Sequence, residues 1–319
     1  MSAFTQSSVQ QEWIPNPVGI PVHYRVRVIA WFSLFFQIGI IAMGGIVRLT
    51  GSGLGCPTWP LCTEDSWIAP ADQGIAGVIE TINRMFSAPL LLSAVLALIF
   101  VWGYRRTRKD LFIPAILVIV VSLGQGLLGW LTIGTDLNTW VVGSKYLISS
   151  GLVALATYFL LRSYSNGLKR HRALPAWMIT SSFVTAAVLL ITLAIGILTT
   201  GSGPHSGDSD VTQRNGLEWD FMTHVHAVPG YVLLALLAVL FLGAYFAKQN
   251  KRFQLRVALL IALILVQIAI GIAQARMALP PVLVGFHMVL AAISVSVMVT
   301  VIYAAWQEEN VAAEETLEG

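Results

Sequence analysis

Two histidines lie inside apolar segments, where a titratable side chain is costly and is by default a candidate for function. His226 follows Asp220 by six residues, and His287 follows Pro280 by seven. At 1.5 Å per helical residue, both lie roughly 9–11 Å below the same membrane surface. Neutral imidazole is a good ligand for heme iron, and two imidazoles at equal depth suit the two faces of one porphyrin. The pair therefore predicts an axial heme ligand set, with hydrogen-bonded packing histidines as the alternative; His224 is a secondary candidate.

The only two cysteines, Cys56 and Cys62, lie in one loop between the first two apolar segments. If this loop faces an oxidising compartment outside the membrane, the cysteines can form a disulfide. Five intervening residues with two prolines allow the Cα atoms to approach within roughly 7 Å. Two unpaired thiols are the alternative. Trp59, between the cysteines, has the position of an interfacial aromatic residue.

The composition is that of an integral membrane protein. The chain is 56% hydrophobic and 11% charged, with a mean hydropathy of +0.75, whereas soluble domains carry about 25% charged residues. Eight segments are long enough to span the hydrocarbon core, about 30 Å thick. They are residues 28–49, 78–103, 111–133, 141–161, 175–199, 221–247, 257–275 and 282–305. We therefore predict an all-α, polytopic protein with eight helices in the lipid bilayer.

The basic residues predict its orientation. Fourteen of the 19 Lys and Arg residues lie before the first span or in the second, fourth and sixth connections. By the positive-inside rule, this side and both termini are cytoplasmic, which places the histidine pair toward the outer face of a cell membrane. Residues 1–27 are expected to form a retained tail, 164–174 a linker, and 307–319 an acidic, solvated tail without chemistry. The scattered basic residues give no sign of nucleic-acid binding.

Internal repeats divide the spans into two halves, residues 28–163 and 175–306. The string TGSG occurs at residues 50–53 and 200–203, and Gln125 and Gly129 recur as Gln267 and Gly271. Each half has an even number of spans, so both halves have the same orientation. The sequence therefore predicts two four-helix bundles related as a parallel repeat.

The same repeat gives each histidine a counterpart in the first half. Asn83 corresponds to His226, and Lys145 corresponds to His287. Asn is a poor iron ligand, and a lysine amine ligates iron only in its neutral form. Lys145 can instead extend toward the interface or pair with Glu80.

Three outer-side charges have two interpretations each. Glu80 can lie beside a porphyrin and relay protons, or form an ordinary i,i+4 ion pair with Arg84. Arg48 and Arg84 can bind heme propionates through bidentate contacts. Arg48 can also simply anchor the first span at the interface.

The string GGIVRLTGSGLGCP at residues 44–57 resembles the heme A synthase family. The resemblance covers all eight spans, including the cysteine pair, Glu80 followed by Arg84, and LVGFH at 283–287. It implies a heme b held by His226 and His287 in the second half. It also implies that the first half binds heme O and oxidises its C8 methyl group to a formyl group through hydroxylation, producing heme A for terminal oxidases. The family's outer-loop disulfide would match Cys56 and Cys62, and its functional glutamate would match Glu80.

The resemblance also implies partners: heme O synthase and an unidentified membrane electron donor, with homo-oligomerisation left open. The chain departs from the family pattern at Asn83 and Lys145, where the family has histidines. This departure motivates an alternative function, a heme-binding, electron-transferring membrane protein without hydroxylation activity. A transporter built on parallel repeats is a further alternative, which predicts broken helices and a cavity at mid-membrane.

Overall fold

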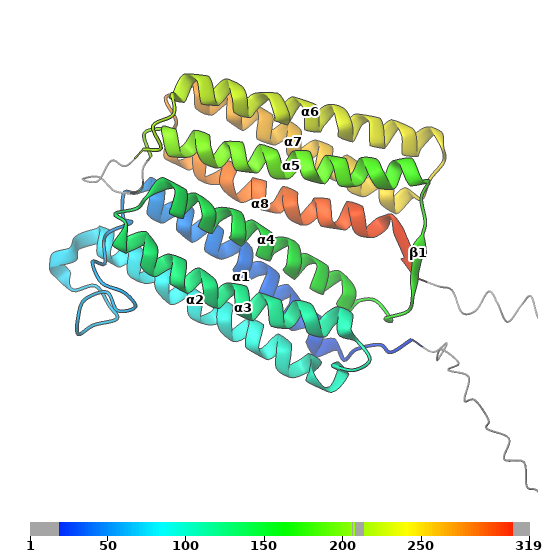
Figure 1. Cartoon of the computed structure of the whole chain (residues 1–319), viewed down its shortest axis with the longest axis horizontal. Helices are drawn as coiled ribbons and strands as arrows, with labels where there is room; N and C mark the ends of the chain where they lie inside the picture. Colours follow the sequence, from blue (N-terminus) through cyan, green and yellow to red (C-terminus); the bar gives the residue numbers. More distant parts are fainter. Residues whose placement is uncertain (1–18, 206, 208–213, 309–319) are drawn as a thin grey trace, which may run out of the picture.

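The computed structural model describes residues 19–205, 207 and 214–308, and it consists mainly of eight long helices (Figure 1). They are α1 (Tyr24–Leu49), α2 (Gly74–Val101), α3 (Lys109–Gly134), α4 (Thr139–Ser163), α5 (Ala176–Ser202), α6 (Trp219–Phe246), α7 (Lys251–Arg276) and α8 (Pro281–Ala304). Short 3-10 turns, η1 (Ala71–Gln73) and η2 (Trp102–Tyr104), flank α2. Every long helix is long and apolar enough to cross a membrane. The predicted all-α class with eight spans is confirmed, and no predicted span end differs from the helix end by more than six residues.

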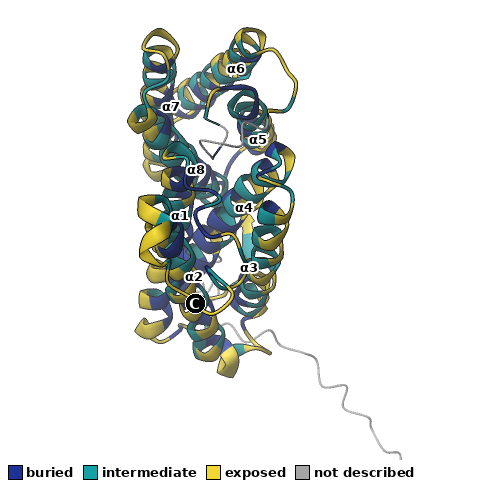
Figure 2. Ribbon diagram, turned by 90° about the vertical axis from the view of Figure 1, so that its left-hand side faces the viewer, coloured by how far each residue is buried: buried dark blue, intermediate teal, exposed yellow. Residues whose placement is uncertain are grey.

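These segments form helices because hydrocarbon offers no hydrogen-bonding partner to the backbone, so each span must satisfy its own N–H and C=O groups. Polar side chains mark several of the starts. His23, Asn138, Glu218 and Asn250 each accept a hydrogen bond from the backbone N–H two residues later, which satisfies one of the N–H groups left over at a helix start. Figure 2 shows buried residues between the helices and exposed residues on their outer faces, where apolar side chains would meet lipid.

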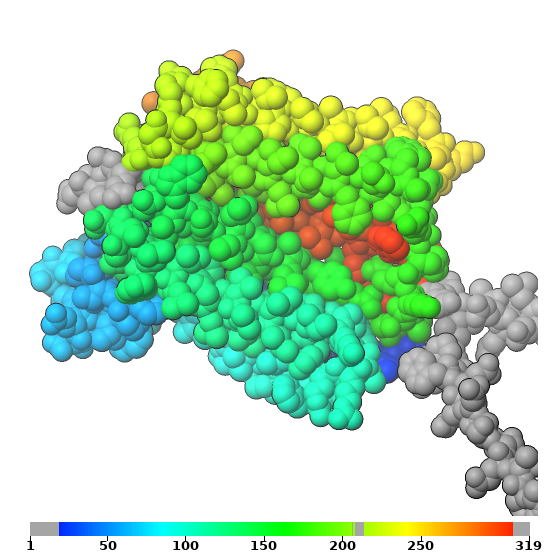
Figure 3. All heavy atoms as spheres, in the orientation of Figure 1, coloured from blue at the N-terminus to red at the C-terminus, as the bar shows by residue number. Residues whose placement is uncertain are grey.

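The helices form two groups of four, α1–α4 and α5–α8 (Figures 1 and 2). Within each group, successive helices pack together and the first packs on the fourth. The groups meet where α8 packs on α1 and α4, and where α4 packs on α5. In the space-filling view, side chains of α8 are visible between α4 and α5 (Figure 3).

Two hydrogen bonds between α4 and α8 bear on the repeat hypothesis. The Tyr146 hydroxyl donates to the carbonyl of Met288 at 2.7 Å, and the Tyr303 hydroxyl donates to the carbonyl of Leu161 at 3.4 Å. The partners are 142 residues apart in both cases, which is the offset that relates the halves. Residues contact their own counterparts where a two-fold axis passes. The parallel-repeat relation stays a prediction, which these contacts support.

An ionic cluster at the end of the molecule opposite the disulfide loop joins several chain segments. The Arg108 guanidinium, 1% exposed, makes two bonds of 3.0 Å to the Asp110 carboxylate. It also donates to the backbone carbonyls of Ile20, Arg162 and Ser165. Arg162 adds a 2.6 Å ion pair to Asp110. The N-terminal segment, α3 and the end of α4 are therefore held by one buried arginine.

The cluster corrects one expectation, because Glu308 is not a solvated tail residue. Its carboxylate accepts hydrogen bonds from Ser165 and from the backbone N–H of Asn166, and it pairs with Arg162 at 3.4 Å. Strands β1 (Arg170–Arg172) and β2 (Trp306–Glu308) form an antiparallel pair that brings it there. The composition predicted a solvated tail. Glu308, the first acidic residue of this tail, is instead held by the β1–β2 pairing and by hydrogen-bond donors at and just after the end of α4. Residues 309–319 of the predicted tail, and 1–18 of the predicted N-terminal tail, lie outside the described residues.

Arg108→Met should lower the stability of the folded protein by about 3 kcal/mol, because removing one partner of a buried ion pair leaves polar groups without compensation. Thermal unfolding of the purified protein in detergent would measure this. Arg106→Met, in the same loop but exposed, is the matched control. Equal melting temperatures for the two variants would contradict the role given to Arg108.

Candidate functional site

One cavity of about 860 Å³ is lined by side chains from all eight helices, most of them apolar. Its lining includes His226 and His287 from the second group of helices. It also includes Glu80, Asn83 and Lys145 from the first group. Pockets that bury small molecules typically measure about 300–1,000 Å³. The sequence-predicted residues of both halves therefore share one interior space of suitable size.

The two histidines face each other across the second half. Their ring centroids lie 6.2 Å apart, with 75° between the ring planes. Two imidazoles that ligate one metal ion from opposite sides, with metal–nitrogen bonds of roughly 2 Å, have centroids about 6 Å apart. The spacing therefore fits a pair of axial ligands to one iron.

The surroundings of the two rings also fit this use. The Nδ1 atoms of His226 and His287 are buried, and no hydrogen bond to either is found within the described part of the chain. Packing histidines normally have such partners. A Cβ on Gly196 would lie 2.7 Å from Cε1 of His226, and a Cβ on Gly271 would lie 3.7 Å from Cε1 of His287. The glycine at 196 is therefore required for the His226 ring to occupy its place.

In the first half, Glu80 is a buried carboxylate with two neighbours on its own helix. Its Oε1 accepts from Arg84 Nε at 3.0 Å, and its Oε2 accepts from the Asn83 amide at 3.4 Å. Lys145 lines the same cavity, and no ion pair within 4.0 Å joins it to Glu80 among the residues described. The i,i+4 pair expected for Glu80 and Arg84 is present, whereas a direct Lys145–Glu80 pair is not.

Lys145 and His287 occupy equivalent surroundings. Gln125 donates its amide to the carbonyl of Lys145 at 3.0 Å, and Gln267 donates to the carbonyl of His287 at 3.1 Å. The Lys145 Nζ lies 4.0 Å from the place of a Cβ on Gly129, as Cε1 of His287 lies 3.7 Å from that on Gly271. The amine of Lys145 therefore lies where the repeat would place the tip of an imidazole.

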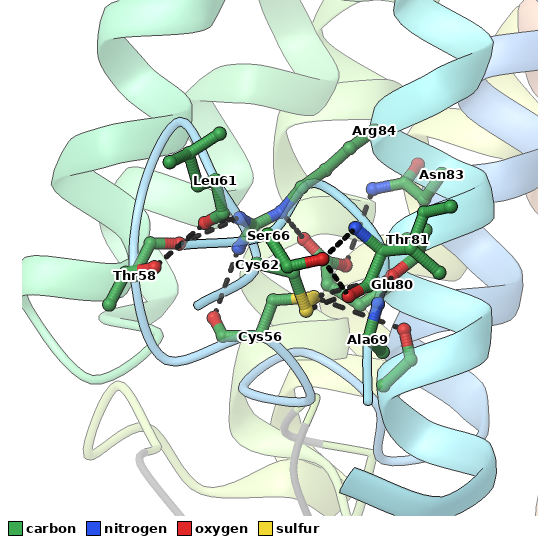
Figure 4. The surroundings of a disulfide bond; sticks show 12 residues. Cys56, Thr58, Leu61, Cys62, Ser66, Ala69, Glu80, Thr81, Asn83 and Arg84 are labelled. Atoms are coloured by element: carbon green, nitrogen blue, oxygen red, sulfur yellow. Dashed lines mark hydrogen bonds and ion pairs between the residues drawn. A yellow bond between two sulfur atoms is a disulfide. The ribbon is translucent and has the colours of Figure 1, made fainter. Parts of the chain in front are cut away.

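The disulfide loop covers the end of the first half that carries Glu80 and Arg84. Cys56 and Cys62 form a disulfide with a Cα–Cα distance of 4.5 Å, and Figure 4 shows Arg84 between Glu80 and this loop. Arg84 donates to the backbone carbonyls of Cys56, Thr58 and Leu61 at 3.0, 2.6 and 2.8 Å. All three guanidinium nitrogens therefore donate to the protein, and the propionate contact expected of Arg84 stays a prediction.

Arg48 connects the two halves at the end of α1. Its Nε donates to the carbonyl of His205 at 2.8 Å and its Nη2 to that of Thr200 at 3.1 Å. Arg48 also lines the cavity, so it both anchors the end of α1 and faces the candidate site. The secondary candidate His224 lies on the cavity rim, with its ring Nδ1 2.8 Å from the carbonyl of Asp220.

Sequence reasoning missed two residues that the structure places at this site. Trp59 lines the cavity and lies against α3, with Nε1 3.4 Å from the place of a Cβ on Gly129. Tyr146, next to Lys145, is the residue that reaches α8. The signal for Trp59 was its position between the two cysteines, and for Tyr146 its position beside the counterpart of His287.

Comparison with known proteins gives consistent results. The family model COX15-CtaA, described as cytochrome oxidase assembly protein, matches residues 27–299. Similar curated proteins are called heme A synthase. The one from Shewanella oneidensis is 24% identical, with 87% of this chain and 96% of that protein covered. The one from Rickettsia prowazekii is 23% identical, with coverages of 84% and 94%.

Other alignments are shorter. The heme A synthase of Bartonella tribocorum is 24% identical over a segment that covers 57% of this chain, and the chain spans 59% of that relative's length. The chain thus covers less than two thirds of this relative.

Proposed function

Because the chain belongs to the COX15-CtaA family of cytochrome oxidase assembly proteins, we propose that it is a heme A synthase. The reaction would convert heme O to heme A by oxidising the C8 methyl group to a formyl group, in support of terminal oxidase assembly. The observation that carries this proposal is the His226–His287 pair, 6.2 Å apart, in a cavity that continues to the buried carboxylate of Glu80. The names of the relatives point to the same activity.

The two halves would hold different hemes. The second half, residues 175–306, would bind a heme b through His226 and His287, and the first half, residues 28–163, would bind heme O beside Asn83 and Lys145. A heme held by two imidazoles has no open coordination position and supplies electron transfer. Arg48, at the cavity wall, would contact a propionate. The linker 164–174 and the tails 1–27 and 307–319 would lie outside the chemistry.

Glu80 would act on protons at the reacting methyl group. Among the described residues it is the only acidic side chain that lines the cavity. Its carboxylate is held by Arg84 and Asn83, so that it cannot rotate away from the cavity without breaking both hydrogen bonds. Trp59 and the apolar lining would exclude water from the substrate. We propose that the amine of Lys145 is the polar group of the first half that would face the center of the bound heme O.

The proposed setting is the cell membrane, with both termini cytoplasmic and the heme sites toward the outer face. The connections that carry most basic residues, α2–α3, α4–α5 and α6–α7, lie at the end drawn on the right in Figure 1, opposite the disulfide loop. This asymmetry supports the orientation by the positive-inside rule. Heme O synthase would supply the substrate, and a membrane electron donor would complete the reaction.

Glu80→Gln should lower heme A formation by at least about 100-fold, as expected when a general acid–base group is lost. The measurement is heme extraction and chromatography from cells that make heme O and express either protein. Glu64→Gln, an exposed outer-loop substitution, is the control and should leave heme A at the wild-type level. If the wild-type protein yields no heme A above background, the enzyme proposal is wrong.

Asn83 and Lys145 favour a second candidate function, a heme-binding, electron-transferring protein that does not hydroxylate. In that case the purified wild type would retain heme b while the cells accumulate only heme O. The same extraction distinguishes the two functions.

A further inference from the structure

Arg84 bonds on one side to the carboxylate of Glu80 and on the other to the disulfide loop (Figure 4). Exposed i,i+4 pairs contribute only a few tenths of a kcal/mol. Arg84 differs because it is largely buried and satisfies backbone carbonyls at three positions of a seven-residue loop closed by a disulfide. These carbonyls are partly buried, and carbonyls removed from water without a donor are costly, so the loop conformation depends on this guanidinium.

We propose that Arg84 is a positioning residue that couples the Cys56–Cys62 loop to Glu80, so that neither can shift without the other. The functional meaning of the coupling rests on the proposed function, in which Glu80 acts on the substrate. The coupling itself is a property of the fold and is measurable without heme.

The loop also brings Trp59 to the cavity that Glu80 lines. Trp59 lies within van der Waals contact of the places that side chains at Gly126 and Gly129 would occupy, at 3.7 and 3.4 Å. The absence of side chains at both positions on α3 allows the indole to reach the cavity wall beside Lys145. Arg84 therefore fixes both the carboxylate of Glu80 and the indole of Trp59 at the wall of the cavity.

The sulfur atoms are held by the residue next to Glu80. The hydroxyl of Thr81 lies 3.6 Å from Sγ of Cys56 and 3.7 Å from Sγ of Cys62. Both sulfurs belong to fully buried residues. A reductant can reach them only when the loop moves away from α2, so the rate of disulfide reduction reports how firmly Arg84 holds the loop.

The test measures reduction of the disulfide by a charged phosphine in the purified full-length protein in lipid nanodiscs, followed by maleimide labelling of the released thiols. Arg84→Gln should accelerate reduction about tenfold, since charge-assisted hydrogen bonds are lost. Glu80→Gln should accelerate it severalfold, although its contact with the loop runs through Arg84. The double variant should be no faster than Arg84→Gln, because the two substitutions break one linkage.

Arg276→Gln, an exposed arginine at the end of α7 on the same side of the molecule, should reduce at the wild-type rate. Reduction of Glu80→Gln at the wild-type rate, or a double variant equal to the product of the two single effects, would overturn the coupling. If Arg84→Gln does not fold, the coupling is decided by comparing the disulfide reduction rates of Glu80→Gln and the control Glu64→Gln. Heme A assays on the same variants are read separately: absence of heme A from the wild type refutes the proposed function, and the reduction rates still decide the coupling.

Discussion

His287→Ala or His226→Ala should leave the purified protein with less than about a tenth of the low-spin, bis-imidazole heme signal expected of the proposed site, since either change would remove one of the two proposed bonds to the iron. The expectation rests on the 6.2 Å centroid spacing and on Nδ1 atoms without hydrogen-bond partners in the described structure. A ring used only for packing would be hydrogen-bonded, and its loss would leave the spectrum unchanged. Absorption and electron paramagnetic resonance spectra of the purified variants measure the effect.

The control is His171→Ala, an exposed histidine in β1, which should retain the full signal. Folding of each variant is checked by its elution profile and its helical circular dichroism. Survival of a two-imidazole heme in both cavity variants would show that the iron is held elsewhere.

Combining Asn83→His with Lys145→His should add a second bis-imidazole heme and raise the low-spin heme content up to about twofold. The reason is the local equivalence of the two halves. The glutamine–carbonyl bond and the facing glycine at Lys145 match those at His287, so an imidazole at 145 enters surroundings already shaped for one. The amide of Asn83, which now bonds Glu80, would be replaced by the second ligand.

Ser144→His is the matched control for this gain. It adds a histidine to the same helix one position away, at an exposed residue. Its heme content should equal that of the wild type. An unchanged spectrum in the double variant, with the protein folded, would contradict the equivalence of the surroundings of Lys145 and His287.

The fold was largely predictable because a bilayer permits few solutions. A span must be apolar, about 20 residues long and helical, so hydropathy alone located all eight helices. The ends were less accurate, since α7 begins at Lys251 through the Asn250 cap although the apolar pattern starts at 257. Caps are set by single polar residues that contribute little to hydropathy.

The candidate site was predictable where the repeat supplied an internal comparison. Their position in apolar spans singled out His226 and His287, and the offset between the halves added Lys145; all three line one cavity. The loop contacts of Arg84 and the position of Glu308 were not predicted because their partners are irregular segments. The carbonyls that bind Arg84 belong to a loop whose path depends on two prolines and a disulfide, and the partners of Glu308 meet it only after β1 and β2 pair. Neither the loop contacts of Arg84 nor those of Glu308 follow a periodic pattern that the sequence could reveal.

Two tyrosine hydrogen bonds join α4 and α8 at different positions along the helices. In one the donor lies on α4, and in the other the donor lies on α8. Tyr146 follows Lys145, and its acceptor Met288 follows His287, while Tyr303 of α8 donates to Leu161 of α4 near the opposite ends of these helices. Sliding of one helix along the other would stretch both bonds. The two bonds therefore resist a change in the spacing between Lys145 on α4 and His287 on α8, so ligands bound beside these residues would be held at a set separation.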